Sequence, residues 1–151
     1  MSTTVDTSRA EPTIRAARLA DADRVYALLE QLEPAYSPDR PAFDLNFPIL
    51  LDDASTSVLL VAEDAAATVI GYALTTITPL LHANGSSAHL QELVVDDAHR
   101  GEGVGTAIVE AVERVCRERA VRQITVASRR SADFYERIGY RSSADFLKRT
   151  F

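Results

Sequence analysis

The sequence has a single cysteine, Cys116, so no disulfide can form within the chain. It has no apolar run near the roughly 18–20 residues that span a bilayer. Its first residues, MSTTVDTSRAEPT, have no apolar core of the kind found in export signals. Basic residues are in deficit, with 16 Lys and Arg against 22 Asp and Glu, which argues against nucleic acid as a partner. These absences predict a cytoplasmic protein that binds neither membranes nor nucleic acids.

What is present is typical of one globular domain, with 46% hydrophobic and 25% charged residues. We expect a loose tail over residues 1–12 and a domain over 13–151. Charge is uneven: residues 1–99 contain 5 Arg against 15 Asp and Glu, a net −10, whereas residues 100–151 contain 11 Lys and Arg against 7 Asp and Glu, a net +4. The second part favours an anionic ligand and the first a cationic one, although charged helix surfaces would give the same pattern.

Hydrophobic periodicity predicts an α/β domain with the order β-α-α-β-β-β-α-β-α-β. Strands are expected at 13–19, 57–63, 68–77, 88–95, 123–127 and 145–151, and helices after Asp21, over 42–53, after the glycines at 101–105 and over 131–138. The second and third strands should form an antiparallel hairpin, and 78–87 should be a loop. The strand–helix–strand segment from Leu90 to Ala127 predicts two parallel neighbours in a mixed sheet with helices on both faces.

The stretch Arg100-Gly101-Glu102-Gly103-Val104-Gly105-Thr106 places three alternating glycines where a strand passes into a helix. The first N–H groups of a helix have no intrahelical partner, and the helix dipole makes that end positive. Glycines let an anion approach these amides, although a tight turn would use the same residues. The Gly-Lys-Ser/Thr of a P-loop is absent, and a dinucleotide fingerprint would need glycine where Thr106 stands.

Arg100, Gly103 and Gly105 fit the Arg/Gln-x-x-Gly-x-Gly/Ala loop of the GCN5-related N-acetyltransferase (GNAT) superfamily, which the sequence resembles over residues 13–150. ELVV and FYERIGY resemble two further segments of that family. The resemblance implies a GNAT-like fold and transfer of an acetyl group from acetyl-CoA to a primary amine of a small molecule, by direct attack and without a metal. A protein or peptide N-acetyltransferase and a non-catalytic CoA-binding domain are the alternatives.

The resemblance also implies where the donor binds. The pyrophosphate of acetyl-CoA would lie on the loop, and the pantetheine arm would pair with the backbone of the ELVV strand, which must then part from the strand at 123–127. Ser128 stands where the family often has an asparagine that touches this arm. The cofactor-binding residues are therefore expected to be Leu93, Val94, Val95, Arg100, Gly101, Gly103, Val104, Gly105, Thr106, Ser128 and Tyr135.

The chemistry needs a base, because a protonated amine has no lone pair with which to attack. His89 and Glu92 are the candidates on this strand, with a water relay as the third possibility. Each also has a structural interpretation, His89 as a hydrogen-bonded histidine and Glu92 as a group that orients the substrate. A backbone N–H near Val94 would stabilise the oxyanion, and Tyr135 corresponds to the tyrosine that meets the leaving thiolate.

The acceptor is expected between the first helices and the loop before the CoA strand, at about residues 33–57 and 78–88. The first of these regions is acidic and aromatic, with Glu33, Asp39, Asp44, Asp52, Asp53, Tyr36, Phe43 and Phe47. Such a lining suits a cationic amine with an apolar body, unless the acids are solvated and the aromatics belong to the core. The family resemblance also permits a homodimer through the last strand.

Overall fold

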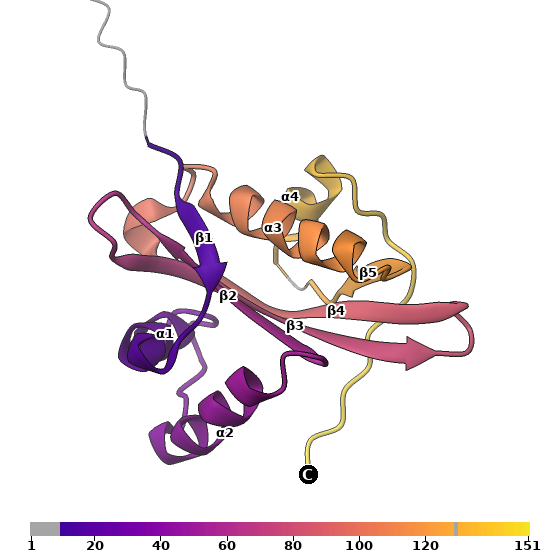
Figure 1. Ribbon diagram of the computed structural model, residues 1–151, viewed down its shortest axis with the longest axis horizontal. Coiled ribbons are helices and arrows are strands. Elements are labelled where there is room, and N and C mark those ends of the chain that lie inside the picture. Colours follow the sequence, from indigo (N-terminus) through magenta and orange to yellow (C-terminus); the bar gives the residue numbers. More distant parts are fainter. Residues whose placement is uncertain (1–9, 129) are drawn as a thin grey trace, which may run out of the picture.

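The computed structural model describes residues 10–128 and 130–151, and its centre is a mixed five-stranded sheet (Figure 1). The strands lie in the order β1-β2-β3-β4-β5. Neighbours are antiparallel except β4 and β5, which are parallel. The strands are β1 (Thr13–Ala16), β2 (Ser57–Glu63), β3 (Val69–Leu80), β4 (Gly85–Val95) and β5 (Gln123–Val126).

Helices cover both faces of this sheet, as Figure 1 shows. One face carries α3 and α4, and the other carries α1 and α2. The helices are α1 (Ala22–Leu29), α2 (Arg40–Asp52), α3 (Val104–Glu118) and α4 (Ala132–Arg137), with short 3₁₀ turns η1 (Leu19–Asp21) and η2 (Asp97–His99). Within the described parts of the chain, no helix is long and apolar enough to cross a membrane.

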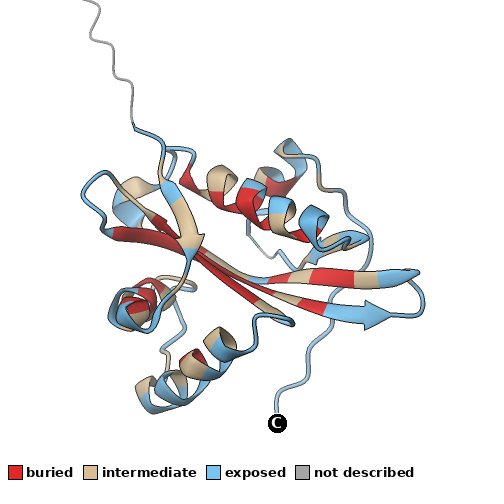
Figure 2. Cartoon of the chain, viewed as in Figure 1, coloured by how far each residue is buried: buried red, intermediate tan, exposed pale blue. Residues whose placement is uncertain are grey.

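Two apolar cores result, because successive side chains of a strand point to opposite faces. The larger core lies between α3 and the sheet and includes Leu60, Leu90, Ile108 and Val112. The smaller one lies under α1 and α2 and includes Leu28, Phe47, Val61, Tyr72 and Val94. Figure 2 shows the buried residues concentrated in the middle strands and on the inner side of α3. The central strands β2 and β3 are therefore covered on both faces.

The predicted hairpin and crossover are confirmed. β2 and β3 pair antiparallel, and β4, α3 and β5 form the strand–helix–strand unit with parallel strands. The helix predicted over 42–53 spans Arg40–Asp52, where Asp39 caps it by accepting the N–H of Ala42 at 3.0 Å. The helix continues through Pro48 without interruption.

Two predicted elements are wrong. Residues 78–87 do not form a long loop, because β3 continues to Leu80 and β4 begins at Gly85. The segment 145–151 forms no strand among the described residues. Its apolar side chains are largely exposed, so no buried face exists to fix the register of a strand. A homodimer through that segment stays a prediction.

The first strand is also shorter than expected, since β1 ends at Ala16 and not at Leu19. Leu19 instead begins η1, which α1 follows directly. Most of the predicted tail at 1–12 lies outside the described residues, which begin at residue 10.

Candidate active site

The sheet opens between β4 and β5. The two strands pair only from Ser87 with Gln123 to Leu90 with Val126. Beyond Leu90, β4 continues to Val95 with β3 on one side and no described strand on the other. The opening expected from the family resemblance is therefore present, and it exposes one backbone edge of the ELVV strand.

A β-bulge lies at the start of this opening. Leu90 is paired with Thr75 and Glu92 with Leu74, so Gln91 is an extra residue on β4. Leu90 and Leu93 both pack into the core under α3. The two residues between them, Gln91 and Glu92, must therefore both point to the opposite face, toward α1 and α2. The bulge thus directs a carboxylate out of the sheet at the point where the strands part.

The alternation of the antiparallel ladder decides which amides face the opening. The N–H of Asp96 donates to the C=O of Ile70 at 2.8 Å, across the β3 pairing. Two residues earlier, the amide of Val94 must also face β3, whereas those of Leu93 and Val95 face the open edge. The amides next to the opening are therefore those of the two neighbours of Val94 and not that of Val94 itself.

The glycine loop has the geometry expected of an anion site. Gly101 and Gly103 have φ angles of 76° and 84°, and a Cβ on either would meet nothing within 4 Å, so conformation and not crowding requires glycine there. Gly105 differs, because its Cβ would lie 3.4 Å from the ring of Phe134. The N-cap residue of α3 is Gly103, and no side-chain hydrogen bond caps the helix there. The first intrahelical hydrogen bond runs from the N–H of Ala107 to the C=O of Gly103, at 3.0 Å. The amides of residues 104–106 lack intrahelical partners.

The polar residues around the loop have local partners. The guanidinium of Arg100 donates to the C=O of Val95 at 3.2 Å and pairs with Asp97 at 2.8 Å. Arg100 therefore lies between the open edge of β4 and the loop. The hydroxyl of Ser128 accepts a hydrogen bond from the N–H of Ser131, at the start of α4, at 3.0 Å. This hydroxyl oxygen therefore already has a partner.

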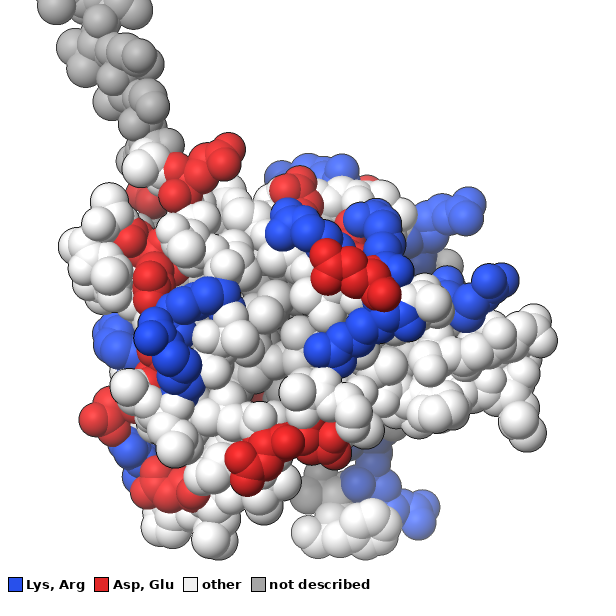
Figure 3. All heavy atoms as spheres, viewed as in Figure 1, with Lys and Arg blue, Asp and Glu red and all other residues white. Residues whose placement is uncertain are grey.

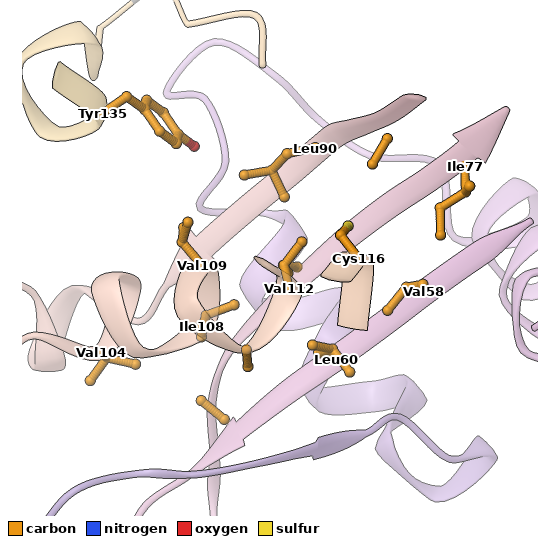
Figure 4. Close-up of a cluster of buried hydrophobic side chains, with 14 of the residues drawn as sticks. Val58, Leu60, Ile77, Leu90, Val104, Ile108, Val109, Val112, Cys116 and Tyr135 are labelled. Carbon is orange, nitrogen blue, oxygen red and sulfur yellow. The ribbon is translucent and has the colours of Figure 1, made fainter. Parts of the chain in front are cut away.

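Tyr135 lies on α4 in the larger core and is 7% exposed. Its ring packs edge-on against Phe134 and Tyr140, with centroids 5.0 and 5.6 Å away. Figure 4 shows its hydroxyl directed toward β4 near Leu90. Burial raises the pKa of Tyr135 to about 12, so the hydroxyl stays protonated at neutral pH and is able to donate a hydrogen bond.

The two candidate bases have different surroundings. The Nδ1 of His89 lies 2.7 Å from the hydroxyl of Thr125 on β5, and its ring stacks on Phe146 with centroids 5.9 Å apart. Desolvation lowers the pKa of His89. Glu92 accepts a hydrogen bond from the hydroxyl of Tyr72 at 2.7 Å. Desolvation, with the charge of Glu92 as a smaller cause, raises the pKa of Tyr72, which therefore acts as a permanent donor.

Glu92 lines a cavity of about 580 Å³ between the sheet and helices α1 and α2, and His89 does not line it. Most of its walls are apolar. They include Val25, Leu29, Leu32, Tyr36, Phe43, Phe47, Leu50, Leu59, Tyr72 and Leu74. The charged residues of the lining are Glu33, Asp39, Glu92 and Lys148. The size and lining suit a small organic molecule.

Part of the region predicted for the acceptor lines this cavity. Glu33, Tyr36, Asp39, Phe43 and Phe47 line the cavity, and the rings of Phe43 and Phe47 stack with centroids 5.1 Å apart.

The other predicted residues lie elsewhere. Asp44 pairs with Arg40 at 2.8 Å, Asp53 accepts from the hydroxyls of Ser55 and Thr56, and Asp52 and residues 78–88 are not part of the described lining.

Sequence reasoning missed Tyr72 and Lys148. A buried tyrosine usually finds a partner for its hydroxyl, so Tyr72 within an otherwise apolar strand was a usable signal. Nothing local to Lys148 predicts that it reaches the cavity from the end of the chain. Among the residues that the structure describes, no group of three or more His, Cys, Asp or Glu could hold a metal.

The unequal charge of the two halves of the sequence is visible on the surface. Figure 3 shows Lys and Arg side chains gathered over the α3 and α4 side, with Asp and Glu more frequent around α1 and α2. The cavity between the sheet and helices α1 and α2 therefore lies on the more acidic side.

Comparisons with known proteins agree with this geometry. A family model described as "Acetyltransferase (GNAT) family" matches residues 22–140. Glucosamine 6-phosphate N-acetyltransferase 1 of Oryza sativa subsp. japonica is 30% identical over 131 residues, which cover 84% of this chain and 79% of that protein.

Solved structures show the same fold. A glucosamine-6-phosphate N-acetyltransferase from Arabidopsis thaliana has a TM-score of 0.81 at 22% identity, over 94% of this chain and 99% of that one. A transcriptional regulator from Bacillus halodurans C-125 has a TM-score of 0.84 at 24% identity, over 93% of this chain and 100% of the other. The family match spans the sheet opening, the glycine loop and Tyr135. The chain therefore belongs to the acetyltransferase (GNAT) family and is an N-acetyltransferase.

Proposed function

We propose that this protein transfers the acetyl group of acetyl-CoA to the primary amine of a small, cationic molecule with an apolar body. One observation carries the proposal. Glu92 lines a cavity of about 580 Å³ on one face of the sheet. It belongs to β4, whose backbone edge beyond Leu90 is not paired with β5. A donor on that edge and an acceptor in the cavity would meet at the bulge beside Glu92.

The donor is held mainly by backbone groups. The free amides of residues 104–106 and the positive end of α3 bind the diphosphate, and the positive φ of Gly103 keeps this approach open. The pantetheine arm extends along β4 and pairs with the outward amides of Leu93 and Val95. Arg100 is close enough to this edge to move from the C=O of Val95 to the diphosphate.

The acceptor amine loses its proton to Glu92 and attacks the thioester carbonyl directly. Tyr72 orients the carboxylate through its hydrogen bond and leaves the second carboxylate oxygen for the amine. An outward amide on β4 stabilises the oxyanion of the tetrahedral intermediate. Tyr135 donates a hydrogen bond to the departing thiolate, since its hydroxyl is protonated at neutral pH. His89 remains outside this path.

The lining favours an apolar amine over a phosphosugar. The two plant relatives are named for glucosamine 6-phosphate, whose phosphate would need cationic partners. Among the described residues of the lining, three are acidic and Lys148 is the one with a positive charge. An aryl-alkyl or branched alkyl ammonium would match both the apolar walls and the carboxylates.

An acetyl-CoA-coupled screen tests the proposal. Acetyl-CoA at 100 times its dissociation constant is expected to stabilise the protein by about 2.7 kcal/mol in thermal unfolding. Thiol release is then measured with aryl-alkyl amines, glucosamine 6-phosphate and peptides. We expect the highest kcat/KM with an apolar amine. Release only with the phosphosugar or only with peptides would contradict the acceptor class, and release with none would contradict catalysis.

A further inference from the structure

Lys148 is the only lysine in the sequence, whose other basic residues are arginines and three histidines. It belongs to the C-terminal segment, which we define as residues 141–151 and which has no regular secondary structure. Lys148 nevertheless lines the acceptor cavity together with Glu92, the proposed base. The one side-chain amine that this enzyme contains therefore lies in the pocket where an acceptor amine is expected.

The path of the C-terminal segment explains how Lys148 reaches the cavity. After α4 the chain crosses from the α3 side of the sheet to the α2 side, where it ends (Figure 1). Phe146 stacks on the ring of His89 in β4, and the next residue, Leu147, is 89% exposed. The aromatic contact thus brings the segment beside β4 two residues before Lys148, although Phe146 itself remains 71% exposed.

The surroundings of Lys148 favour an amine that approaches the reaction centre. The cavity carries the carboxylates of Glu33, Asp39 and Glu92, which attract an ammonium group. No ion pair holds Lys148 to a partner among the described residues, so its flexible side chain is not fixed in one position. A tethered group of this kind has a far higher effective concentration than a dissolved amine.

We propose that Lys148 is an intramolecular acceptor, so that the enzyme acetylates its own C-terminal segment; this inference rests on the proposed function. The ammonium of Lys148 gives a proton to Glu92, and the free Nζ attacks the carbonyl carbon of acetyl-CoA. A C–N bond forms and the C–S bond breaks. The nitrogen then loses a second proton, which protonates the departing thiolate. The products are Nε-acetyl-Lys148 and the thiol form of CoA.

Mass spectrometry of the full-length protein tests this step. The chain is incubated with acetyl-CoA alone, over a tenfold range of protein concentrations, and acetylation is located by peptide mapping. We expect one acetyl group on Lys148, with a first-order rate constant independent of protein concentration. The rate should exceed that of the same chain unfolded in urea by at least about tenfold. Lys148→Arg, which keeps the charge, should gain no acetyl group apart from any on the N-terminal amine.

A second measurement on the same samples separates this inference from the proposed function. An apolar amine from the screen is added, and both thiol release and Lys148 acetylation are followed. Competition for one cavity should slow the acetylation of Lys148 as the amine approaches saturation. Turnover of the amine with Lys148 unmodified would overturn self-acetylation and leave the proposed function intact. A rate proportional to protein concentration, or one equal to that of the unfolded chain, would also overturn it, and a lack of both reactions would contradict both proposals.

Discussion

Replacement of Glu92 by glutamine is expected to lower kcat for a small amine by about 10²–10⁴-fold, because the proposed general base is then lost. Glutamine has nearly the same shape and keeps an oxygen that accepts the hydrogen bond of Tyr72, now 2.7 Å from the carboxylate. The fold and the affinity for acetyl-CoA should therefore change little. Steady-state thiol release and a separate acetyl-CoA titration measure the two effects.

His89→Gln is the matched control for this prediction. It also removes a titratable group from β4, and glutamine is able to keep a hydrogen bond to Thr125, whose hydroxyl lies 2.7 Å from the Nδ1 of His89. Since His89 does not line the cavity, kcat should remain within a few-fold of the wild-type value. The opposite ranking, with the His89 variant far slower than the Glu92 variant, would make His89 the base.

Tyr135→Phe is expected to lower kcat by roughly 10- to 150-fold, which corresponds to a hydrogen bond of about 1.5–3 kcal/mol to a charged thiolate. The ring would still pack against Phe134 and Tyr140, so the structure should be kept. The dissociation constant of acetyl-CoA should change by no more than a few-fold, because the hydroxyl meets a charge that develops during the reaction.

The pH dependence of Tyr135→Phe gives a further check. Burial raises the pKa of Tyr135 to about 12, so the protonated donor is present below that value and is lost only as the pH rises through it. The ratio of wild-type to variant kcat should therefore stay constant from pH 6 to pH 9. A ratio that falls within this range, or an unchanged kcat, would remove the hydroxyl from the mechanism.

The parts of the fold that local rules govern were predictable from the sequence. The apolar stripe of α3, the glycines before it and the buried strands on either side depend on nearest neighbours and helical spacing, and the crossover appears as expected. The turn between β3 and β4 carried a local signal as well. Asn84-Gly85 is a dipeptide typical of hairpins; in the structure Asn84 has a φ of 56° and directly precedes Gly85, which pairs with Leu80.

The site itself depends on features that no local pattern encodes. The bulge at Gln91 involves neither glycine nor proline, and it is defined only by the pairing of β4 with β3. It nevertheless decides that Glu92 faces the cavity. The C-terminal segment is a similar case, because the contact of Phe146 with His89 joins residues far apart in the sequence. The residue types of His89 and Glu92 identified both as candidate bases. The pairing of β4 with β3 determines that Glu92, and not His89, faces the cavity.

The most direct test of this account is a crystal structure of the protein with CoA. We predict that diphosphate oxygens lie about 2.7–3.2 Å from the amide nitrogens of residues 104–106. The pantetheine arm should extend along the open edge of β4, bonded to Leu93 and Val95, with the thiol directed toward Glu92. A diphosphate bound away from α3, or a β4 edge that stays closed to the ligand, would contradict the account.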